Sequence, residues 1–256
     1  MLAVAILSLA AIVAAHPMQL HGRGVAQVIT QCATPNTAAL TFDDGPYQWM
    51  DQIADMLDAN QAKGTFFLRD CIYNEAEVGR VQRTYAKGHQ IASHTWAHAH
   101  LNSLSKDQIT SEFTRSQDAI EKITGAKVAF TRPPYGEYND VVEQVASEQN
   151  QALVLWDFDS ADSAGANADQ IRQNYQNLVA SKPINVLTLN HEVQQPTVDE
   201  LSNTINTLKG AGYQLVTVAD CLGMQPYLSV GSAGQPDVNV LSTGSKRKKL
   251  IPSSPF

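Results

Sequence analysis

Two histidines and two adjacent carboxylates are the residues of this chain whose types and spacing are best suited to binding a metal ion. His94 and His98 lie four residues apart after an apolar run. Asp43 and Asp44 end an earlier apolar run and precede the turn pair Gly45-Pro46. A His-His-Asp set leaves coordination positions open, which is typical of a hydrolytic zinc site. The alternatives are a chance histidine pair on a surface and a solvated carboxylate in a turn.

The acid pair can divide two tasks between its members. Adjacent side chains at the end of a strand point in different directions. One carboxylate can therefore bind the ion while the other takes the proton of an attacking water. The ion would lower the pKa of that water and polarise a substrate carbonyl. These residues predict metal-assisted hydrolysis.

His191 is a candidate proton donor, because it follows the apolar run that ends at Leu189. With Asp159 or Asp162 as an orienting carboxylate, it would protonate a leaving amine or alcohol. A buried, hydrogen-bonded structural histidine is the alternative. The chain has no Gly-x-Ser-x-Gly elbow, which argues against a serine hydrolase.

Arg132 and Tyr135 complete the candidate set. Arg132 is expected to hold the base Asp through a bidentate ion pair, and a salt bridge at the rim is the alternative. Pro133 and Pro134 remove two backbone donors and stiffen the chain before Tyr135. The backbone N–H of Tyr135 would then face a developing oxyanion.

The pattern of the chain predicts a scaffold that brings these distant residues together. Seven short apolar runs, often β-branched or aromatic, are typical of strands buried on both faces: 37–42, 64–68, 90–94, 128–131, 152–156, 185–189 and 214–218. Segments with helical spacing separate them: 48–60, 75–86, 105–125, 138–148, 168–179 and 198–208. Strict alternation implies right-handed parallel crossovers with the polar strand ends on one side. We predict an α/β fold, a distorted, incomplete (β/α) barrel of about seven parallel strands, with an open doubly wound sheet as the runner-up.

Five polar clusters, in this order, resemble the signature motifs of the polysaccharide deacetylases, the carbohydrate esterases of family four with a NodB-homology domain. They are Thr41-Phe42-Asp43-Asp44, Ser93-His94-Thr95-Trp96-Ala97-His98, Arg132-Pro133-Pro134-Tyr135, Asp159-Ser160-Ala161-Asp162 and Leu189-Asn190-His191. Five ordered motifs are far more specific than any single one. The match predicts a catalytic domain over residues 31–222.

The resemblance implies a divalent metal, usually zinc with Co²⁺ as an alternative, held by Asp44, His94 and His98. It implies Asp43 as the general base and His191 as the general acid. The implied reaction removes N-acetyl groups from the glucosamine units of chitin or chitooligosaccharides and releases acetate. An acetyl xylan esterase of the same family and a catalytically impaired chitin-binding protein are the alternatives.

The resemblance also implies supporting roles around these groups. Arg132 would fix Asp43, Asp162 would tune His191, and the backbone N–H of Tyr135 would stabilise the oxyanion. Leu189 would line the acetyl pocket. One residue departs from the family pattern, because Ser163 stands where a tryptophan normally walls this pocket. Acyl selectivity is therefore the property that the departure puts in question.

Composition and charge limit the class of partner. A chain of 256 residues with 43% hydrophobic content can form one large domain with a substantial core. Its formal net charge of −7 argues against nucleic acid or an anionic membrane as a partner, because such binding needs clustered cations. We expect a monomer whose partner is a carbohydrate.

The two ends of the chain differ from the predicted domain. Residues 1–15 form an apolar segment ending in small residues, which predicts a secretory signal peptide and an extracellular or cell-wall location. A hydrophobic N-terminal helix is the alternative. Residues 223–256 are rich in Ser, Gly and Pro and lack apolar periodicity, so we expect a disordered tail.

Secretion would permit a disulfide among the three cysteines. Cys32 precedes the first predicted strand and Cys221 follows the last, so a bond between them would join the two ends of the barrel. Cys71 would then be a free thiol, more often a buried apolar residue than a nucleophile. The placement of Cys32 and Cys221 is similar to that in secreted fungal chitin deacetylases.

Overall fold

Nine strands form one parallel sheet in a computed structural model that describes residues 24–70 and 75–234. They are β1 (Val28–Ile29), β2 (Thr37–Gly45), β3 (Gly64–Leu68), β4 (Gln90–Ser93), β6 (Phe130–Thr131), β7 (Ala152–Val154), β8 (Phe158–Asp159), β9 (Val186–Leu189) and β10 (Gln214–Leu215). The strand order is β1-β7-β6-β4-β3-β2-β9-β8, and β10 also pairs with β2. A second, antiparallel pair joins β5 (Ala126–Val128) to β11 (Tyr227–Val230).

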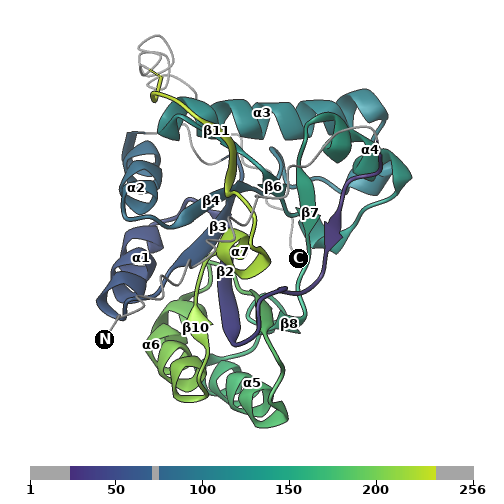
Figure 1. Cartoon of the computed structure of the whole chain (residues 1–256). Coiled ribbons are helices and arrows are strands. Elements are labelled where there is room, and N and C mark those ends of the chain that lie inside the picture. The colour runs from purple at the N-terminus through teal and green to yellow at the C-terminus, as the bar shows by residue number, and fades with distance from the viewer. Residues whose placement is uncertain (1–23, 71–74, 235–256) are drawn as a thin grey trace, which may run out of the picture.

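The helices surround the strands, as Figure 1 shows. They are α1 (Met50–Ala59), α2 (Glu75–Ala86), α3 (Lys106–Thr124), α4 (Asp140–Glu148), α5 (Ala168–Ser181), α6 (Gln195–Gly210) and α7 (Val218–Leu222). Two short 3-10 helices, η1 (Leu101–Ser103) and η2 (Pro134–Gly136), follow β4 and β6. The sheet is curled, and its end strands β1 and β8 do not pair with each other within the described residues. This architecture confirms the predicted distorted, incomplete (β/α) barrel.

Alternation along β2 explains how one strand serves both the core and the site. Leu40 and Phe42 belong to the apolar cluster that includes buried residues of α1, and Phe42 stacks on Phe66 of β3 with ring centroids 5.2 Å apart. Thr41 and Asp43, on the opposite face, contact a buried arginine instead. The apolar face fixes the register of the strand, and the polar face is thereby aimed into the barrel.

Local signals in the sequence placed most helix ends correctly. The predicted helix 105–125 is α3: Ser105 caps it through a capping box with Gln108, and it ends at Gly125 in a left-handed conformation with φ 78°. Several strand predictions differ from the structure, since the run 37–42 extends to residue 45 and the run 152–156 ends at residue 154. The run 128–131 splits between β5 and β6, and the run 214–218 is a strand only to Leu215. Thr217 caps the helix α7, because its hydroxyl accepts the backbone N–H of Asp220.

The tail predicted from residue 223 is wrong in its first part. Residues 227–230 form β11, which pairs with β5 and brings Gly231 against Gly125. The hydroxyl of Tyr227 accepts the backbone N–H of Ile91, at 3.0 Å. Pairing to a sheet edge, which leaves no periodic apolar signal, accounts for the difference. The rest of that segment, 235–256, lies outside the described residues, as do the predicted signal peptide and Cys71.

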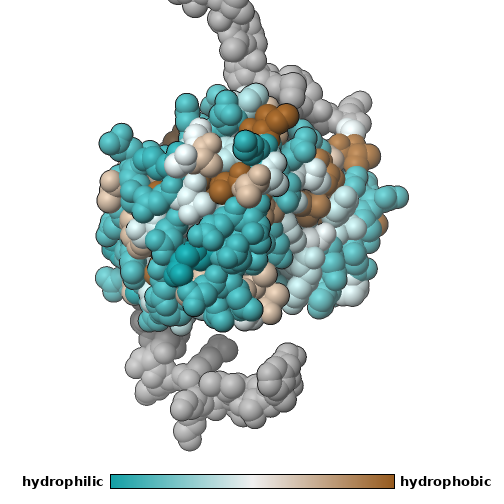
Figure 2. All heavy atoms as spheres, turned by 90° about the horizontal axis from the view of Figure 1, so that it is seen from below, coloured by the Kyte–Doolittle hydropathy of each residue, from teal (hydrophilic) through white to brown (hydrophobic). Residues whose placement is uncertain are grey.

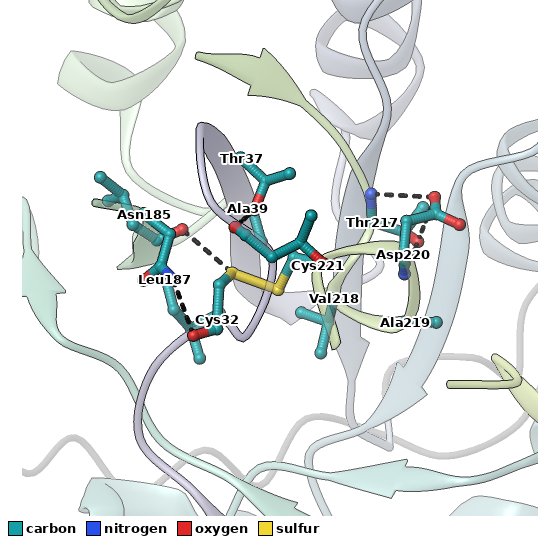
Figure 3. The surroundings of a disulfide bond; sticks show 12 residues. Cys32, Thr37, Ala39, Asn185, Leu187, Thr217, Val218, Ala219, Asp220 and Cys221 are labelled. Atoms are coloured by element: carbon teal, nitrogen blue, oxygen red, sulfur yellow. Dashed lines mark hydrogen bonds between the residues drawn. A yellow bond between two sulfur atoms is a disulfide. The ribbon is translucent and has the colours of Figure 1, made fainter. Parts of the chain in front are cut away.

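A disulfide joins Cys32 and Cys221, across a sequence separation of 189 residues (Figure 3). Both cysteines are buried. The carbonyl of Cys221 also accepts the backbone N–H groups of Ala33 and Thr34, at 3.0 and 2.9 Å. The bond therefore ties the segment before β2 to α7, as the cysteine positions suggested.

The surface view in Figure 2 shows a face that is largely hydrophilic, with hydrophobic residues only in small groups. Among the residues that the structure describes, no helix is both long enough and apolar enough to cross a bilayer. This result agrees with the absence of a second long apolar run in the sequence after residue 15.

Candidate active site

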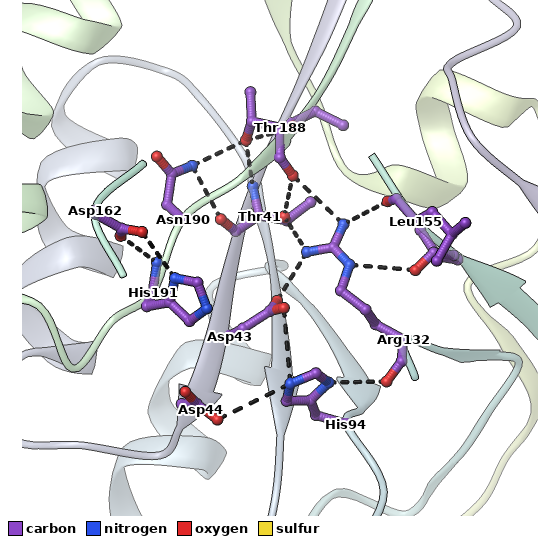
Figure 4. Close-up of polar contacts among 12 residues, drawn as sticks. Thr41, Asp43, Asp44, His94, Arg132, Leu155, Asp162, Thr188, Asn190 and His191 are labelled. Atoms are coloured by element: carbon purple, nitrogen blue, oxygen red, sulfur yellow. Dashed lines mark hydrogen bonds and ion pairs between the residues drawn. The ribbon is translucent and has the colours of Figure 1, made fainter. Parts of the chain in front are cut away.

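The carboxyl ends of four parallel strands bring the predicted site residues together. Asp43 and Asp44 lie at the end of β2. His94 and Arg132 directly follow β4 and β6, and His191 lies two residues after the end of β9. Because these strands run in parallel, their ends lie at one edge of the curled sheet. Figure 4 shows the resulting cluster.

Two of these side chains form a potential metal centre together with His98. One ligand atom from each of Asp44, His94 and His98 lies within 4.8 Å of the other two. The Oδ1 atom of Asp44 is 3.9 Å from Nε2 of His94 and 3.5 Å from Nε2 of His98. The two imidazole rings meet edge to face with centroids 4.8 Å apart. The spacing of four residues is therefore accommodated by a tight loop.

The donor atoms of this cluster fit a divalent cation. Nδ1 of His94 donates to the backbone carbonyl of Arg132 at 2.8 Å, so Nε2 keeps its lone pair and faces the carboxylate. Burial holds the pKa of His94 well below its usual range, despite the nearby Asp44 carboxylate, so the imidazole is neutral. Oδ1 of Asp44 is buried without a hydrogen-bond donor. A bound cation would satisfy that oxygen.

Asp43 lies beside the potential metal centre but is held by a different partner. Its side chain is buried, and its Oδ1 accepts a hydrogen bond from Nη1 of Arg132 at 2.8 Å. Its Oδ2 faces Nε2 of His94 at 3.8 Å. Burial raises the pKa of Asp43, and the Arg132 charge only partly offsets this effect. The two acids of the pair therefore have different surroundings, as predicted.

Arg132 is fully buried, so the alternative of a salt bridge at the rim is wrong. The expected bidentate contact is also wrong, because Nη1 alone reaches Asp43. The other N–H groups donate to carbonyl oxygens of Val154 and Leu155, at 3.2 and 2.9 Å. The guanidinium also stacks over the Phe67 ring, 4.3 Å from its centroid. This arrangement fixes the arginine from several sides and leaves one donor for the carboxylate.

The sequence analysis did not predict a buried network of polar side chains that contacts Arg132. The hydroxyl of Thr41 accepts from Nη1 of Arg132 at 2.6 Å. The amide of Asn190 donates to the carbonyl of Thr41 and to the hydroxyl of Thr188, at 3.1 and 2.9 Å. The polar residues inside otherwise apolar strands could have indicated this network, because buried polar groups need hydrogen-bond partners.

His191 is paired with Asp162 rather than with Asp159. Its Nδ1 lies 2.8 Å from Oδ1 of Asp162, and its backbone N–H donates to Oδ2 at 2.6 Å. Thr197 donates a second hydrogen bond to the same Oδ2. Burial alone would lower the pKa of His191, but the Asp162 hydrogen bond and the Asp43 charge raise it to about 9. The pKa of Asp162 lies below its usual value, because these hydrogen bonds outweigh its burial.

Tyr135 and Leu189 differ in how far their side chains are exposed to solvent. The Tyr135 side chain is 54% exposed, and its backbone adopts a left-handed conformation with φ 60°. Its ring meets the His98 ring edge to face, with centroids 4.6 Å apart, and stacks on His100 at 4.0 Å. Leu189 is 6% exposed and is the last residue of β9. Tyr135 is therefore an exposed neighbour of the metal cluster.

Glu192 is a further buried polar residue that the sequence did not reveal. It is fully buried, and its Oε1 accepts the backbone N–H of Tyr47 at 2.5 Å. A Cβ at Gly45 would lie 2.3 Å from the Glu192 carboxyl carbon, so only glycine leaves room for this side chain. Burial raises the pKa of Glu192 well above its usual value. Glu192 thereby links the turn after Asp44 to the loop after β9.

The loop around Ser163 is built from small residues. Ser163 is exposed, and its backbone N–H donates to Oδ1 of Asp162 at 2.7 Å. Next to this loop lies a hollow of about 340 Å³, lined in part by Ala161, Ala164 and Gly165. The loop thus supports the Asp162 carboxylate with a backbone group, whatever the side chain at 163.

Sequence and structure comparisons agree on one group of proteins. The family model described as "Polysaccharide deacetylase" matches residues 30–154. A chitin deacetylase from a Pestalotiopsis species is 38% identical over 207 residues, which cover 78% of this chain and 68% of that protein. A chitin deacetylase from Arthroderma benhamiae is 34% identical over 77% of this chain, which spans about half of that longer protein (54%).

A solved structure has the same architecture. The chitin deacetylase from the fungal pathogen Colletotrichum lindemuthianum superposes with a TM-score of 0.74 and 28% sequence identity. The alignment covers 80% of this chain and 95% of that structure. The shared region therefore includes nearly all of the solved domain.

Proposed function

Because the chain belongs to the polysaccharide deacetylase family, we propose that it removes N-acetyl groups from the glucosamine units of chitin or chitooligosaccharides and releases acetate. One observation carries this proposal. A three-residue cluster that suits a divalent cation lies beside a buried carboxylate, and this carboxylate's residue is the backbone neighbour of a histidine whose pKa is raised. A metal, a proton acceptor and a proton donor are the groups that metal-assisted amide hydrolysis uses.

Asp44, His94 and His98 would hold the metal, for which we propose zinc. When bound, the ion supplies Lewis acidity to the acetyl carbonyl and lowers the pKa of the attacking water. The neutral imidazole of His94 and the Oδ1 atom of Asp44, which is buried and accepts no hydrogen bond, support this assignment.

Asp43 would be the general base. Arg132 occupies its Oδ1, so Oδ2, which faces the cluster, is the atom that takes the proton from water. The single hydrogen bond from Arg132 orients the carboxylate without blocking the second oxygen. Arg132 is therefore a positioning residue in this scheme.

His191 would be the general acid. Asp162 accepts a hydrogen bond from Nδ1, so Nε2 is the atom that delivers a proton to the leaving amine. A pKa of about 9 keeps this imidazole protonated at neutral pH. The leaving nitrogen needs such a proton, because an amide anion is a poor leaving group.

Two further residues would contact the substrate. The backbone N–H of Tyr135 would stabilise the oxyanion, and Leu189 would line the acetyl pocket. The position of Tyr135 beside His98 supports the first role, and that of Leu189 two residues before His191 supports the second. Ser163 leaves this pocket without the tryptophan of the family, so we propose tolerance of acyl groups larger than acetyl. We further propose that the protein is secreted, which the Cys32–Cys221 disulfide supports.

Acetate release from a panel of substrates tests the proposal. We expect release from N-acetylchitooligosaccharides, its loss after chelation and its return on addition of zinc. Release from acetylated xylan or peptidoglycan alone would refute the substrate assignment. No release from any of them would indicate a binding protein without catalysis.

Two variants separate the proposed roles. Asp43→Asn should retain zinc and lose rate, because it removes only the base. His94→Ala should lose zinc, because it removes a ligand. Near wild-type activity in Asp43→Asn would overturn the assignment of the base.

A further inference from the structure

One face of helix α3 contacts the loop that carries the two histidines of the metal cluster. Glu112, Arg115 and Ser116 are spaced at i, i+3 and i+4, so they share a face of the helix. Each of them contacts a residue of the segment from Ser93 to Ala97. None of the three has a role in the proposed chemistry.

Glu112 makes the most specific of these contacts. Its Oε2 accepts the backbone N–H groups of both Trp96 and Ala97, at 2.9 and 2.7 Å. These two residues lie between His94 and His98 in the chain. A single carboxylate oxygen therefore holds the backbone that sets the distance between the two imidazoles.

The neighbouring contacts support the same segment. The Arg115 guanidinium lies 4.2 Å from the centroid of the Trp96 ring, in a cation–π geometry. The Ser93 hydroxyl donates to the hydroxyl of Ser116 at 3.0 Å and accepts the backbone N–H of Thr95 at 3.1 Å. The helix thus contacts the loop both at its start and in the stretch just before His98.

This loop needs external support because its backbone is unfavourable. Thr95 and His98 adopt left-handed conformations with φ 63° and 53°. Such conformations are costly for residues other than glycine and persist only where the surroundings impose them. Charge-assisted hydrogen bonds from backbone N–H groups to a carboxylate are among the stronger ones available.

We propose that Glu112 is a positioning residue of the metal site, which it controls through the backbone between His94 and His98. This inference rests on the proposed function, because it requires that the cluster binds a cation. Removing the carboxylate releases two donors and frees the loop to leave its left-handed conformation. The Nε2 atoms of the two histidines are then no longer held where both can bind one ion, and zinc binds more weakly.

Zinc affinity of the metal-free full-length protein, measured by competition with a chromophoric chelator, tests the proposal. We expect Glu112→Ala to raise the zinc dissociation constant by about 10- to 100-fold, the range seen when groups that orient metal ligands are removed. Glu112→Gln should lose less affinity, because its amide oxygen can accept both N–H groups. Asp118→Ala, an exposed carboxylate on the same helix, is the matched control and should leave the constant unchanged.

The outcomes distinguish this inference from the proposed function. If the wild-type protein does not bind zinc, the proposed metal site fails. If the wild type binds zinc and Glu112→Ala binds it within twofold, the role of Glu112 is refuted. A lower melting temperature of the metal-free variant with an unchanged dissociation constant would indicate a purely structural role and refute it equally.

Should Glu112→Ala not fold, Glu112→Asp provides the same test. Aspartate keeps the charge but withdraws the carboxylate by one methylene, so it cannot reach both N–H groups. Zinc affinity in Glu112→Asp that equals the wild-type value would overturn the proposal.

Discussion

Replacing Asp162 by asparagine should move the basic limb of the pH-rate profile to lower pH. Asp162 accepts hydrogen bonds from Nδ1 and from the backbone N–H of His191, at 2.8 and 2.6 Å. Its hydrogen bond is the largest influence that raises the pKa of His191 against the effect of burial. Asparagine keeps the size of the side chain but removes the charge, so the imidazolium loses its main stabilisation.

The size of the effect depends on pH. The pKa of His191 is about 9 in the folded protein against a usual value of 6.5, a difference worth about 3 kcal/mol. If Asp162→Asn returns the pKa to 6.5, the protonated fraction at pH 8 falls about 30-fold, and at pH 6 it falls less than about twofold. A loss of rate that grows with pH is therefore the signature of this mechanism.

The assay is kcat/KM for an N-acetylchitooligosaccharide from pH 5 to 10, because this quantity reports the ionisations of the free enzyme. NMR titration of the His191 ring gives its pKa directly. An unchanged basic limb in Asp162→Asn would refute the reasoning, as would a wild-type His191 that titrates below pH 7.

Two control variants isolate the charge effect. Asp159→Asn makes the same chemical change three residues earlier, at the end of β8, but Asp159 is exposed and accepts the backbone N–H of Ala161 instead. It should leave the basic limb in place. Thr197→Val removes one donor to Oδ2 of Asp162 without removing its charge, and it too should keep the limb above neutral pH.

Four further results are expected. The pKa of His191 is higher in the folded protein than its usual value of 6.5, so this group adds stability that is fully present below pH 6.5 and lost as the pH rises through about 9. Denaturant unfolding at several pH values across that window measures this contribution. Replacing both cysteines of the disulfide by serine should lower the free energy of unfolding by about 4–5 kcal/mol in the same assay, because the bond restricts the unfolded chain. A change below about 1 kcal/mol would contradict this reason. Gly45→Ala should cost about 1–3 kcal/mol and most of the activity, since the new Cβ would collide with Glu192; a fully active variant would show that the carboxyl moves freely. Arg132→Leu should cost about 3–5 kcal/mol by leaving Asp43 buried without its partner, and equal urea midpoints for variant and wild type would rule this out.

Buried strands and helix caps were predictable because each depends on a few neighbouring residues. The strand Gly64–Leu68 and the helix Glu75–Ala86 have the predicted bounds, and the Ser105 capping box is present. The strand β11 was not predictable, because its stability comes from pairing with Ala126–Val128, a segment about one hundred residues away. Local periodicity contains no record of such a partner.

In the site, too, the residues marked by their local sequence were predictable and those that act through distant contacts were not. The residues proposed for chemistry lie at strand ends, where acidic and histidine side chains interrupt an apolar pattern and are conspicuous. Glu112 and Glu192 were missed, since each acts on the backbone of a distant segment through a contact that only the fold creates. The geometry of Arg132 was also mistaken, because nearby backbone carbonyls take the donors that a second contact to Asp43 would need.

The link between Cys32 and Cys221 encloses every proposed site residue, from Asp43 to His191, in one covalent ring. A protease that cuts a single surface loop inside this ring converts the chain into two fragments that stay attached. Their reassociation is intramolecular and independent of dilution. A nicked molecule would therefore keep an assembled site until a reductant separates its halves.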